Sequence, residues 1–403
     1  MNYISTRGAA PRLGFEDVML AGLAEDGGLY VPENWPQFSS DDIRAMRGLA
    51  YEDVALRVMT PLVGDFVDGK ELEEMVRAAY GQFSHAATVP LVQLSENHWL
   101  MELFHGPTLA FKDVAMQILG RMMDHALKRR KQRATVLAAT SGDTGGAAIE
   151  AFRGRDAADI FVLHPHGRVS EVQRRQMTTV LNANVHNIAV EGTFDDCQSL
   201  VKAMFNDQPF RRRMALSGVN SINWARIMAQ TVYYFTSAVA LGAPDRPVSF
   251  CVPTGNFGDI YAGYVAKNMG LPVDQLVIAT NVNDILARTL ETGRYETRAV
   301  TATTSPSMDI QVSSNFERLL FDVHGREANN VTRLMAGLQQ SGAFTIAEGP
   351  LAELRAGFAA GRTSETETAA TIRKTLEETG ELVDPHTAIG VNVANNLAGD
   401  RSA

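Results

Sequence analysis

The stretch ATVLAATSGDTGGAAIEAF, residues 134–152, decides the fold class, because it passes from a strand pattern to a helix pattern across one glycine-rich loop. Its apolar start, residues 134–139, predicts a buried strand, and its alanine-rich end, which runs through Phe152, predicts a helix. Repeated strand–loop–helix units form parallel sheets with helices packed on their faces. The stretch therefore predicts an α/β fold.

The same order of elements returns along the chain. Further apolar or alternating runs predict strands over residues 159–163, 183–190, 248–252 and 276–279. A helix capped by Ser170 is expected after the first of these strands. A second helix, capped by Thr193 or Asp195 and running through Met204, is expected after the next strand.

Two α/β domains are expected, each an open, twisted and mostly parallel sheet with helices on both faces. The larger domain is discontinuous and consists of residues 1–112 and 226–403. Residues 113–225 form a smaller, mobile domain. A ligand is expected in the cleft between the domains, at the C-terminal ends of the strands.

The composition excludes several classes of protein. With 403 residues and a net charge of −9, the chain is not expected to bind nucleic acid, and the basic run 128–133 is interpreted as the C-terminal end of a helix. Cys197 and Cys251 have no metal-ligand spacing, so neither a metal site nor a disulfide framework is expected. Because no apolar stretch approaches membrane-spanning length and no secretory leader is recognisable, we expect a cytoplasmic protein without membrane contact.

A lysine in the stretch FHGPTLAFKD, residues 104–113, is the first candidate for chemistry. Lys112 follows a Gly-Pro turn at the expected start of a helix, and Phe104 and Phe111 flank the site. Desolvation between apolar neighbours favours the neutral amine, which can form a Schiff base with an aldehyde and act as a base. Taken alone, such a lysine is more often a surface residue with a buried stem. His105 is a candidate acid or base, with a structural histidine as the alternative.

A second candidate is the stretch VSFCVPTGNFGD, residues 248–259. Its glycines allow backbone N–H groups to approach a phosphate, and the following helix adds a favourable dipole. A glycine turn between a strand and a helix is more often only a turn. Because the stretch is neither a Walker loop nor G-x-G-x-x-G, nucleotide fingerprints are absent.

Three more loops carry polar residues. The hydroxyls and N–H groups of residues 141–145 suit a carboxylate; a helix N-cap by Ser141 or Asp143 is the alternative, and the two are compatible. Residues 220–226 suggest an anion pocket distinct from the glycine loop, with ordinary helix capping and a surface arginine as the alternative. Residues 384–387 form a turn that leads into a helical stretch.

Together these stretches resemble the threonine synthase family of pyridoxal-phosphate enzymes, within the tryptophan-synthase-β-like group of fold type II. The matching segments follow the family's order and span nearly the whole chain. They are STRG (5–8), DGGLYVP (26–32), FHGPTLAFKD (104–113), SGDTG (141–145), NSINWAR (220–226), GNFGD (255–259), SSNFER (313–318) and DPHT (384–387). The resemblance also implies that residues 1–95 include a family-specific N-terminal segment.

The resemblance implies roles for individual residues around a pyridoxal 5′-phosphate held in the interdomain cleft. Lys112 would form the Schiff base, Thr387 would face the pyridine nitrogen, and Asp143 would stand where related enzymes carry an asparagine near the phenolic oxygen. The expected ligands of the cofactor phosphate are Gly255, Asn256, Phe257, Gly258 and Asp259. The expected substrate ligands are Ser141 and Thr144 for the carboxylate and Ser221, Asn223 and Arg226 for the phosphate.

The implied reaction converts O-phospho-L-homoserine and water into L-threonine and phosphate, in a monomer or homodimer. The alternatives are a related lyase, such as a threonine or serine dehydratase or an amino-alcohol phospho-lyase, and a non-catalytic relative that binds the cofactor or phosphorylated ligands. Family members usually continue beyond the segment that holds Thr387, so we expect either that the sequence is trimmed or that the last element is missing.

Overall fold

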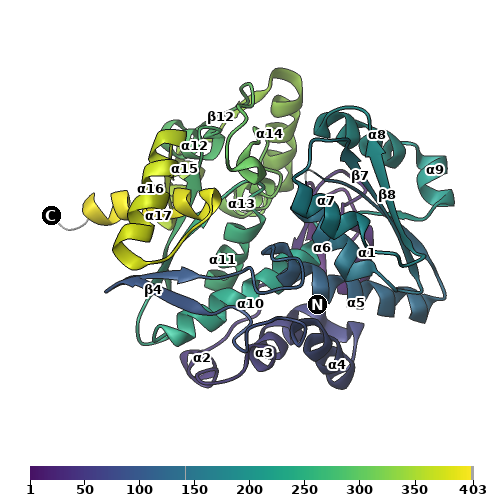
Figure 1. Cartoon of the computed structure of the whole chain (residues 1–403), viewed down its shortest axis with the longest axis horizontal. Helices are drawn as coiled ribbons and strands as arrows, with labels where there is room; N and C mark the ends of the chain where they lie inside the picture. The colour runs from purple at the N-terminus through teal and green to yellow at the C-terminus, as the bar shows by residue number, and fades with distance from the viewer. Residues whose placement is uncertain (141, 401–403) are drawn as a thin grey trace.

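Two parallel sheets organise the molecule, as the computed structural model of residues 1–140 and 142–400 shows (Figure 1). The first has the order β8-β7-β6-β9 and consists of β6 (Ala134–Ala139), β7 (Ala158–Pro165), β8 (Val185–Val190) and β9 (Leu216–Ser217). The second has the order β10-β11-β14 and consists of β10 (Val248–Pro253), β11 (Val273–Thr280) and β14 (Phe358–Arg362). The predicted α/β class with helix-covered parallel sheets is confirmed.

Three small antiparallel sheets complete the strands. They pair β1 (Asn2–Ser5) with β2 (Leu13–Gly14) and β3 (Tyr30–Pro32), β4 (Leu91–Ser95) with β5 (His98–Met101), and β12 (Arg294–Glu296) with β13 (Ala343–Thr345). Strands β9 and β14 had no counterpart in the prediction. Strand β9 is only two residues long, and the small residues of FAAGR in β14 do not alternate clearly.

The helices cover both faces of the parallel sheets. Before the first parallel sheet lie α1 (Phe15–Ala21), α2 (Ser40–Arg44), α3 (Tyr51–Val63), η1 (Gly64–Phe66), α4 (Gly69–Tyr80) and α5 (Lys112–Arg130). Within and after it lie α6 (Asp143–Phe152), α7 (Glu171–Thr178), α8 (Phe194–Asn206), α9 (Gln208–Arg213) and α10 (Trp224–Ala240). The second sheet carries α11 (Gly258–Asn268), α12 (Ile285–Thr292), η2 (Pro306–Met308), α13 (Phe316–Val323), α14 (Ala328–Ser341), α15 (Glu348–Gly357), α16 (Glu365–Thr379) and α17 (Pro385–Asp400).

Local sequence signals account for several helix ends. The Ser170 side chain accepts a hydrogen bond from Gln173 N and caps α7, as predicted. Of the two caps considered for α8, Thr193 is the one used, in a reciprocal capping box with Asp196. The basic run lies at the C-terminal end of α5, as predicted, where its cations complement the helix dipole.

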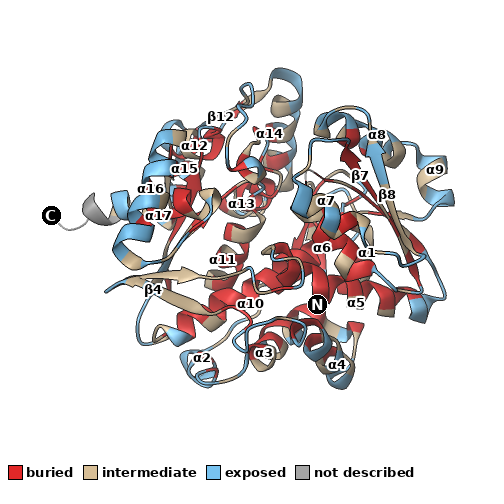
Figure 2. Ribbon diagram, in the orientation of Figure 1, coloured by how far each residue is buried: buried red, intermediate tan, exposed pale blue. Residues whose placement is uncertain are grey.

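Helices α5 and α10 are buried along most of their length and pack against each other (Figure 2). Helix α10 is apolar nearly all round, and Trp224 and Phe235 are fully buried. A helix without a polar face is stable only when neighbours cover all its sides. These two helices therefore fix how the sheets are placed around the cleft.

The N-terminal strands are tied to the second half of the chain. The Arg7 guanidinium pairs with Glu317 at 3.0 Å, and the Thr6 hydroxyl donates to the same carboxylate at 2.7 Å. The fully buried Arg318 donates to the carbonyl oxygens of Tyr30 and Ile222. The matching segments near residues 5, 26 and 313 are thus neighbours in space. Across the described part of the chain, no helix combines the length and the apolar character needed to span a membrane.

Candidate functional site

A cleft of about 1920 Å³ opens between the two parallel sheets, and it brings most of the predicted site residues together. Its lining includes residues from both halves of the molecule, namely Lys112, Asp143, Thr144, Ser221, Arg226, Gly255, Asn256, Phe257, Gly258, Asp259 and Thr387. Asn223 is not among the lining residues. Ser141 lies outside the described residues.

Lys112 is the first residue of α5, and a tight turn sets its position. The Asp113 carboxylate accepts hydrogen bonds from Thr108 N at 2.7 Å and from Thr108 Oγ1 at 2.8 Å. A Cβ atom on Gly106 would lie 2.5 Å from Asp113 Cβ, so only glycine fits there. The turn therefore holds the lysine in a fixed place at the start of the helix.

Both flanking phenylalanines line the cleft, and Phe111 contacts the Lys112 ammonium. The Lys112 ammonium lies 4.8 Å from the centre of the Phe111 ring, whereas Phe104 is 48% exposed and stacks on His105. Lys112 itself is buried. Burial lowers the pKa of Lys112, the nearby charge and hydrogen bond of Asp143 oppose the shift, and Arg226 lowers it further. The pKa of Lys112 is therefore lowered overall, which favours a neutral amine.

Asp143, the first residue of α6, is the direct partner of Lys112 through its Oδ2 atom. The same oxygen accepts a hydrogen bond from Ser307 Oγ at 3.3 Å. Burial alone would raise the pKa of Asp143, but the charge and hydrogen bond of Lys112 bring it below its ordinary value. The pair consequently consists of a carboxylate that stays ionised and an amine that loses its proton easily.

Three N–H groups of the loop after β6, those of Gly142, Thr144 and Gly145, already have partners within the loop, which differs from the prediction that they are free for an anion. The buried Thr140 Oγ1 accepts from Gly142 N and Gly145 N, each at 2.9 Å. Asp143 Oδ1 accepts from Thr144 N at 2.9 Å. Asp143 and Thr144 are the described residues of this loop that line the cleft.

The loop after β10 has a shape that fits a phosphate. A Cβ atom on Gly255 would lie 2.5 Å from the carbonyl oxygen of Ser307, so the backbone approaches that carbonyl as closely as only glycine allows. Phe257 has the left-handed φ of 65°, and α11 begins directly after it. Its ring is buried against Phe316 and Phe358, so only its backbone is available to a ligand.

Asp259 has a different environment from the rest of this loop. Its carboxylate accepts hydrogen bonds from the hydroxyls of Tyr233 and Tyr234. Burial raises the pKa of Asp259, and the two tyrosine hydroxyls oppose that shift only in part. The described contacts therefore direct the side chain toward α10, which leaves the backbone N–H as its contact to an anion.

The cluster at the start of α10 does not act as one unit. The buried Asn223 caps the helix, since its Oδ1 accepts from Ala225 N at 3.0 Å and its Nδ2 donates to Met19 O at 2.8 Å. Arg226 is also buried, but its Nε has no hydrogen-bond partner among the described residues. Burial lowers the pKa of Arg226 to about 10, and Asp143 partly opposes this.

The glycine loop and the α10 cluster are neighbours, although the sequence suggested two separate sites. A Cβ atom on Gly258 would lie 3.7 Å from Ser221 O, and Asn315 Nδ2 donates to both Ser221 O and Asn256 O. Arg226 is also close enough to Lys112 to influence its charge. The glycine loop and the start of α10 therefore form one continuous part of the cleft lining, which extends to Arg226.

Thr387 lines the cleft from the first turn of α17. Asp384 Oδ1 accepts from Thr387 N at 2.9 Å, and Asp384 Oδ2 pairs with His386 Nδ1 at 2.8 Å. Burial would raise the pKa of Asp384, but hydrogen bonds from His386 and Thr387 bring it down to about 2. This carboxylate thereby holds both side chains at the edge of the cleft.

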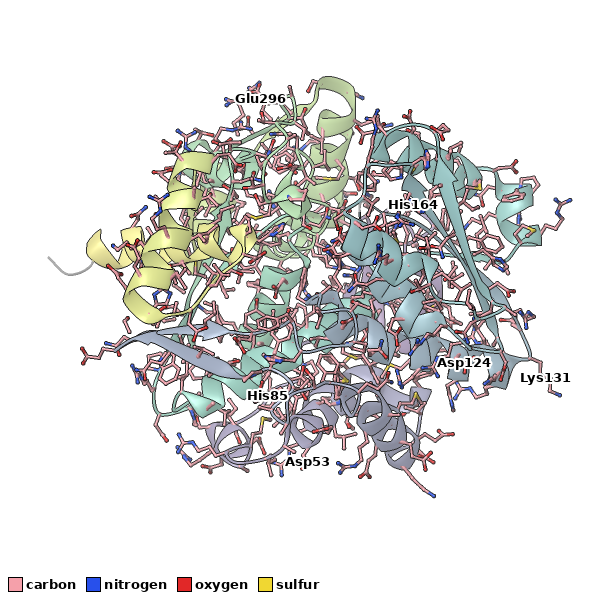
Figure 3. All side chains as sticks on the ribbon, viewed as in Figure 1. Asp53, His85, Asp124, Lys131, His164 and Glu296 are labelled. Atoms are coloured by element: carbon pink, nitrogen blue, oxygen red, sulfur yellow. The ribbon has the colours of Figure 1, made fainter. Side chains whose placement is uncertain are left out.

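Most histidines of the described chain lie outside the site. His105 pairs with Glu102 at 2.7 Å and is not among the residues that line the cleft, which agrees with the structural alternative. Figure 3 labels His164 on β7 and His85 before β4, and neither of these lines the cleft. His386, which the sequence reading mentioned without a role, does line it.

The sequence reading missed Ser307, Tyr233 and Tyr234. Ser307 lies in the turn η2, in the segment SPSM, and it carries no glycine-loop or charge pattern that marks a site. The tyrosines lie on α10, where sequence periodicity indicates only a buried face. Their hydrogen bonds to Asp259 depend on the placement of α10 beside α11, which no local pattern reveals.

Comparisons with known proteins identify the family of the chain. The family model described as "Threonine synthase N terminus" matches residues 2–80, and the model described as "Pyridoxal-phosphate dependent enzyme" matches residues 85–336. A threonine synthase of Pseudomonas aeruginosa is 57% identical over 394 residues, which cover 98% of this chain and 84% of the relative.

Solved structures show the same likeness. The crystal structure of a pyridoxal-phosphate-bound threonine synthase from Brucella melitensis has a TM-score of 0.97 and 65% identity, and covers 98% of this chain and 85% of that one. The threonine synthase from yeast has a TM-score of 0.95 and 40% identity, and covers 100% of this chain and 85% of that one. Fold and site thus define a pyridoxal-phosphate-dependent enzyme of the α/β type. Within that class, the chain belongs to the threonine synthase family.

Proposed function

We propose that the enzyme converts O-phospho-L-homoserine and water into L-threonine and inorganic phosphate, with pyridoxal 5′-phosphate held in the cleft. The observation that carries the proposal is the buried Lys112, whose amine meets Asp143 in the same cleft as the glycine loop. The chain's membership in the threonine synthase family supports this reaction over those of related lyases and over a non-catalytic binder.

The residues present fit the cofactor. The backbone around Gly255, Asn256, Phe257 and Gly258, with the N–H of Asp259, would hold its phosphate, because a glycine-tight turn leads directly into the N-terminus of α11. Lys112 would bind its aldehyde carbon, and Thr387 would donate a hydrogen bond to its ring nitrogen. When bound, the cofactor supplies an aldehyde that captures amines and a ring that stabilises negative charge at Cα.

Lys112 is proposed to move the proton at Cα of the substrate. Burial and Arg226 both favour its neutral amine, and a neutral amine near the working pH is an effective base. Asp143 is proposed to keep Nζ oriented and to stabilise the lysine whenever it carries the proton. Together the two residues form a base whose charge state is set by their surroundings.

The substrate is expected to provide the anion that Arg226 lacks. A buried guanidinium with an unpaired Nε is costly unless an anion meets it, and the substrate phosphate is such an anion. Ser221 would contact the same group, and Thr144 with Ser141 would hold the carboxylate. Asn223 is proposed to support the pocket by capping α10 rather than by touching substrate.

We also propose that residues 113–225 move as a smaller domain against residues 1–112 and 226–403. The support is the separate four-stranded sheet that residues 134–217 form, with the cleft beside it. The proposed enzyme is a cytoplasmic monomer or homodimer. Sedimentation of the purified protein with and without cofactor tests its oligomeric state.

The test of the function is a paired product assay. The purified enzyme is loaded with cofactor and given O-phospho-L-homoserine, and inorganic phosphate and L-threonine are measured together. We expect the two products to appear in equal amounts. Release of phosphate with 2-oxobutanoate in place of threonine would assign the protein to the lyase alternative, and binding without turnover would assign it to the non-catalytic one.

A further inference from the structure

Ser307 connects two sides of the cleft. Its Oγ atom lies 3.3 Å from Asp143 Oδ2, the oxygen that also meets Lys112. Its backbone N–H donates to His386 Nε2 at 3.3 Å. Asp143 belongs to α6, which flanks the four-stranded sheet, whereas Ser307 and His386 belong to the part built around the three-stranded sheet.

The His386 ring has a defined orientation in this arrangement. Because Nε2 accepts the Ser307 N–H, the ring proton belongs on Nδ1, where it is donated to Asp384 Oδ2 at 2.8 Å. Asp384 also fixes Thr387. The start of α17 is thereby joined through His386 and Ser307 to the Lys112–Asp143 pair.

The segment that presents Ser307 is held firmly from behind. Asp309 Oδ1 accepts from Asn281 Nδ2 at 2.8 Å, from Asn283 Nδ2 at 3.0 Å and from Thr303 Oγ1 at 2.7 Å. Asp309 Oδ2 accepts from Thr303 N at 2.8 Å. The partly buried Asp309 carboxylate accepts four hydrogen bonds and thereby fixes the loop that carries Ser307. The position of Ser307 therefore does not depend on Asp143.

We propose that Ser307 is a positioning residue. Its hydroxyl orients the Asp143 carboxylate toward Lys112 and weakens the stabilisation that this carboxylate gives to the protonated lysine. This inference rests on the proposed role of Lys112. A hydroxyl that donates to a carboxylate stabilises its negative charge. Without that hydroxyl, the Asp143 carboxylate attracts the Lys112 ammonium more strongly, and Lys112 keeps its proton to a higher pH.

Other charged groups also act on the pair. Arg226 on α10 opposes a charged Lys112, and His386 on α17 acts on Asp143. Asp113 lies next to Lys112 on α5, but its carboxylate is occupied by Thr108. Substitution of Ser307 leaves all of these groups in place, so a change in lysine reactivity reports on the hydroxyl.

The experiment measures the reactivity of Lys112 directly. The full-length protein is freed of cofactor and treated with pyridoxal and cyanoborohydride over a range of pH, and modification at Lys112 is followed by peptide mass spectrometry. For Ser307→Ala we expect the pH midpoint to rise by about half a unit, which makes modification ~3-fold slower below the midpoint. Ser307→Thr keeps the hydroxyl and is expected to retain the wild-type midpoint.

Two further variants make the result decisive. Thr304→Ala removes an exposed hydroxyl three positions away and is expected to change nothing. Ser307→Cys is nearly isosteric but donates weakly, so it should shift the midpoint in the same direction even if Ser307→Ala folds poorly. A wild-type midpoint in folded Ser307→Cys and Ser307→Ala would overturn the proposal. Turnover that persists in Lys112→Ala would instead overturn the proposed role of Lys112, on which this inference rests, whatever the Ser307 variants show.

Discussion

At the scale of single residues, the site depends on one amine whose proton is easily lost. Lys112→Ala removes both the group that binds the cofactor aldehyde and the proposed base. Loss of a general base alone costs about 10²–10⁴-fold in rate, so we expect the loss of turnover to reach the top of that range or to exceed it. Formation of threonine by Lys112→Ala at near the wild-type rate would show that another group performs the chemistry.

Arg226 gives a second prediction, because it is a buried cation whose Nε has no partner among the described residues. For Arg226→Ala we expect kcat/KM to fall by an amount equivalent to about 1.5–3 kcal/mol, because a charged hydrogen bond to the substrate is lost. The absorption spectrum of the bound cofactor should stay the same. Arg226→Lys keeps the positive charge but lacks the planar set of N–H donors of a guanidinium, so its kcat/KM should lie between those of Arg226→Ala and the wild type. If Arg226→Ala loses the cofactor yet keeps its substrate affinity, the arginine serves the cofactor.

Thr387 gives the third prediction at this scale. A hydroxyl at the ring nitrogen leaves that nitrogen unprotonated, whereas a carboxylate favours its protonated form. We expect Thr387→Asp to bind the cofactor with a shifted spectrum and to form more 2-oxobutanoate relative to threonine. Thr387→Ser keeps the hydroxyl and should resemble the wild type. A wild-type product ratio in Thr387→Asp would mean that Thr387 only completes the first turn of α17.

At the scale of elements, the junction of β10 and α11 determines whether a phosphate fits. A Cβ atom on Gly255 would lie 2.5 Å from the Ser307 carbonyl oxygen, and backbone atoms have little room to move. For Gly255→Ala we expect cofactor affinity to fall by about 1–3 kcal/mol, the usual cost of overpacking. A spectrophotometric titration measures this change. Gly349→Ala on α15 is the matched control, because nothing lies within 4 Å of its added Cβ.

Sequence patterns predicted the elements that carry the site because each pattern is local. The apolar run before residue 140, the Ser170 cap and the glycine loop all depend on neighbours within a few positions. Ser307 could not be found in this way, since its contacts are with residues 79 and 164 positions away. The capping role of Asn223 was open in the sequence; the hydrogen bond from Ala225 N to its Oδ1 establishes that role, and the distant Met19 O accepts from its Nδ2.

At the scale of the whole molecule, the cleft is larger than its proposed contents. Its volume of about 1920 Å³ exceeds the roughly 300–1,000 Å³ of common small-molecule sites. Leu109 and Val172 line it although they are 66% and 68% exposed. Narrowing of the cleft around a ligand would cover this apolar surface.

We therefore expect a smaller radius of gyration when cofactor and inorganic phosphate are both bound, as measured by small-angle X-ray scattering. Val172→Ser should weaken this contraction, because it removes apolar surface at the cleft. Leu181→Ser is the control, since Leu181 is 92% exposed and is not among the residues that line the cleft. An unchanged radius at saturating ligand would indicate that the two halves keep their separation.

The contacts of Thr6 and Arg7 with Glu317 have a consequence for synthesis on the ribosome. Glu317 follows Thr6 by 311 positions and Arg7 by 310 positions. In contrast, the strands of the first parallel sheet all lie between residues 134 and 217. At about 5–20 residues per second, Glu317 emerges on the order of 15–60 seconds after Arg7. The middle of the chain can complete its sheet during this interval, while the N-terminal strands still lack their carboxylate partner. Nascent chains that stall before residue 317 should therefore expose the N-terminal segment to proteases and chaperones, although their four-stranded sheet is already formed.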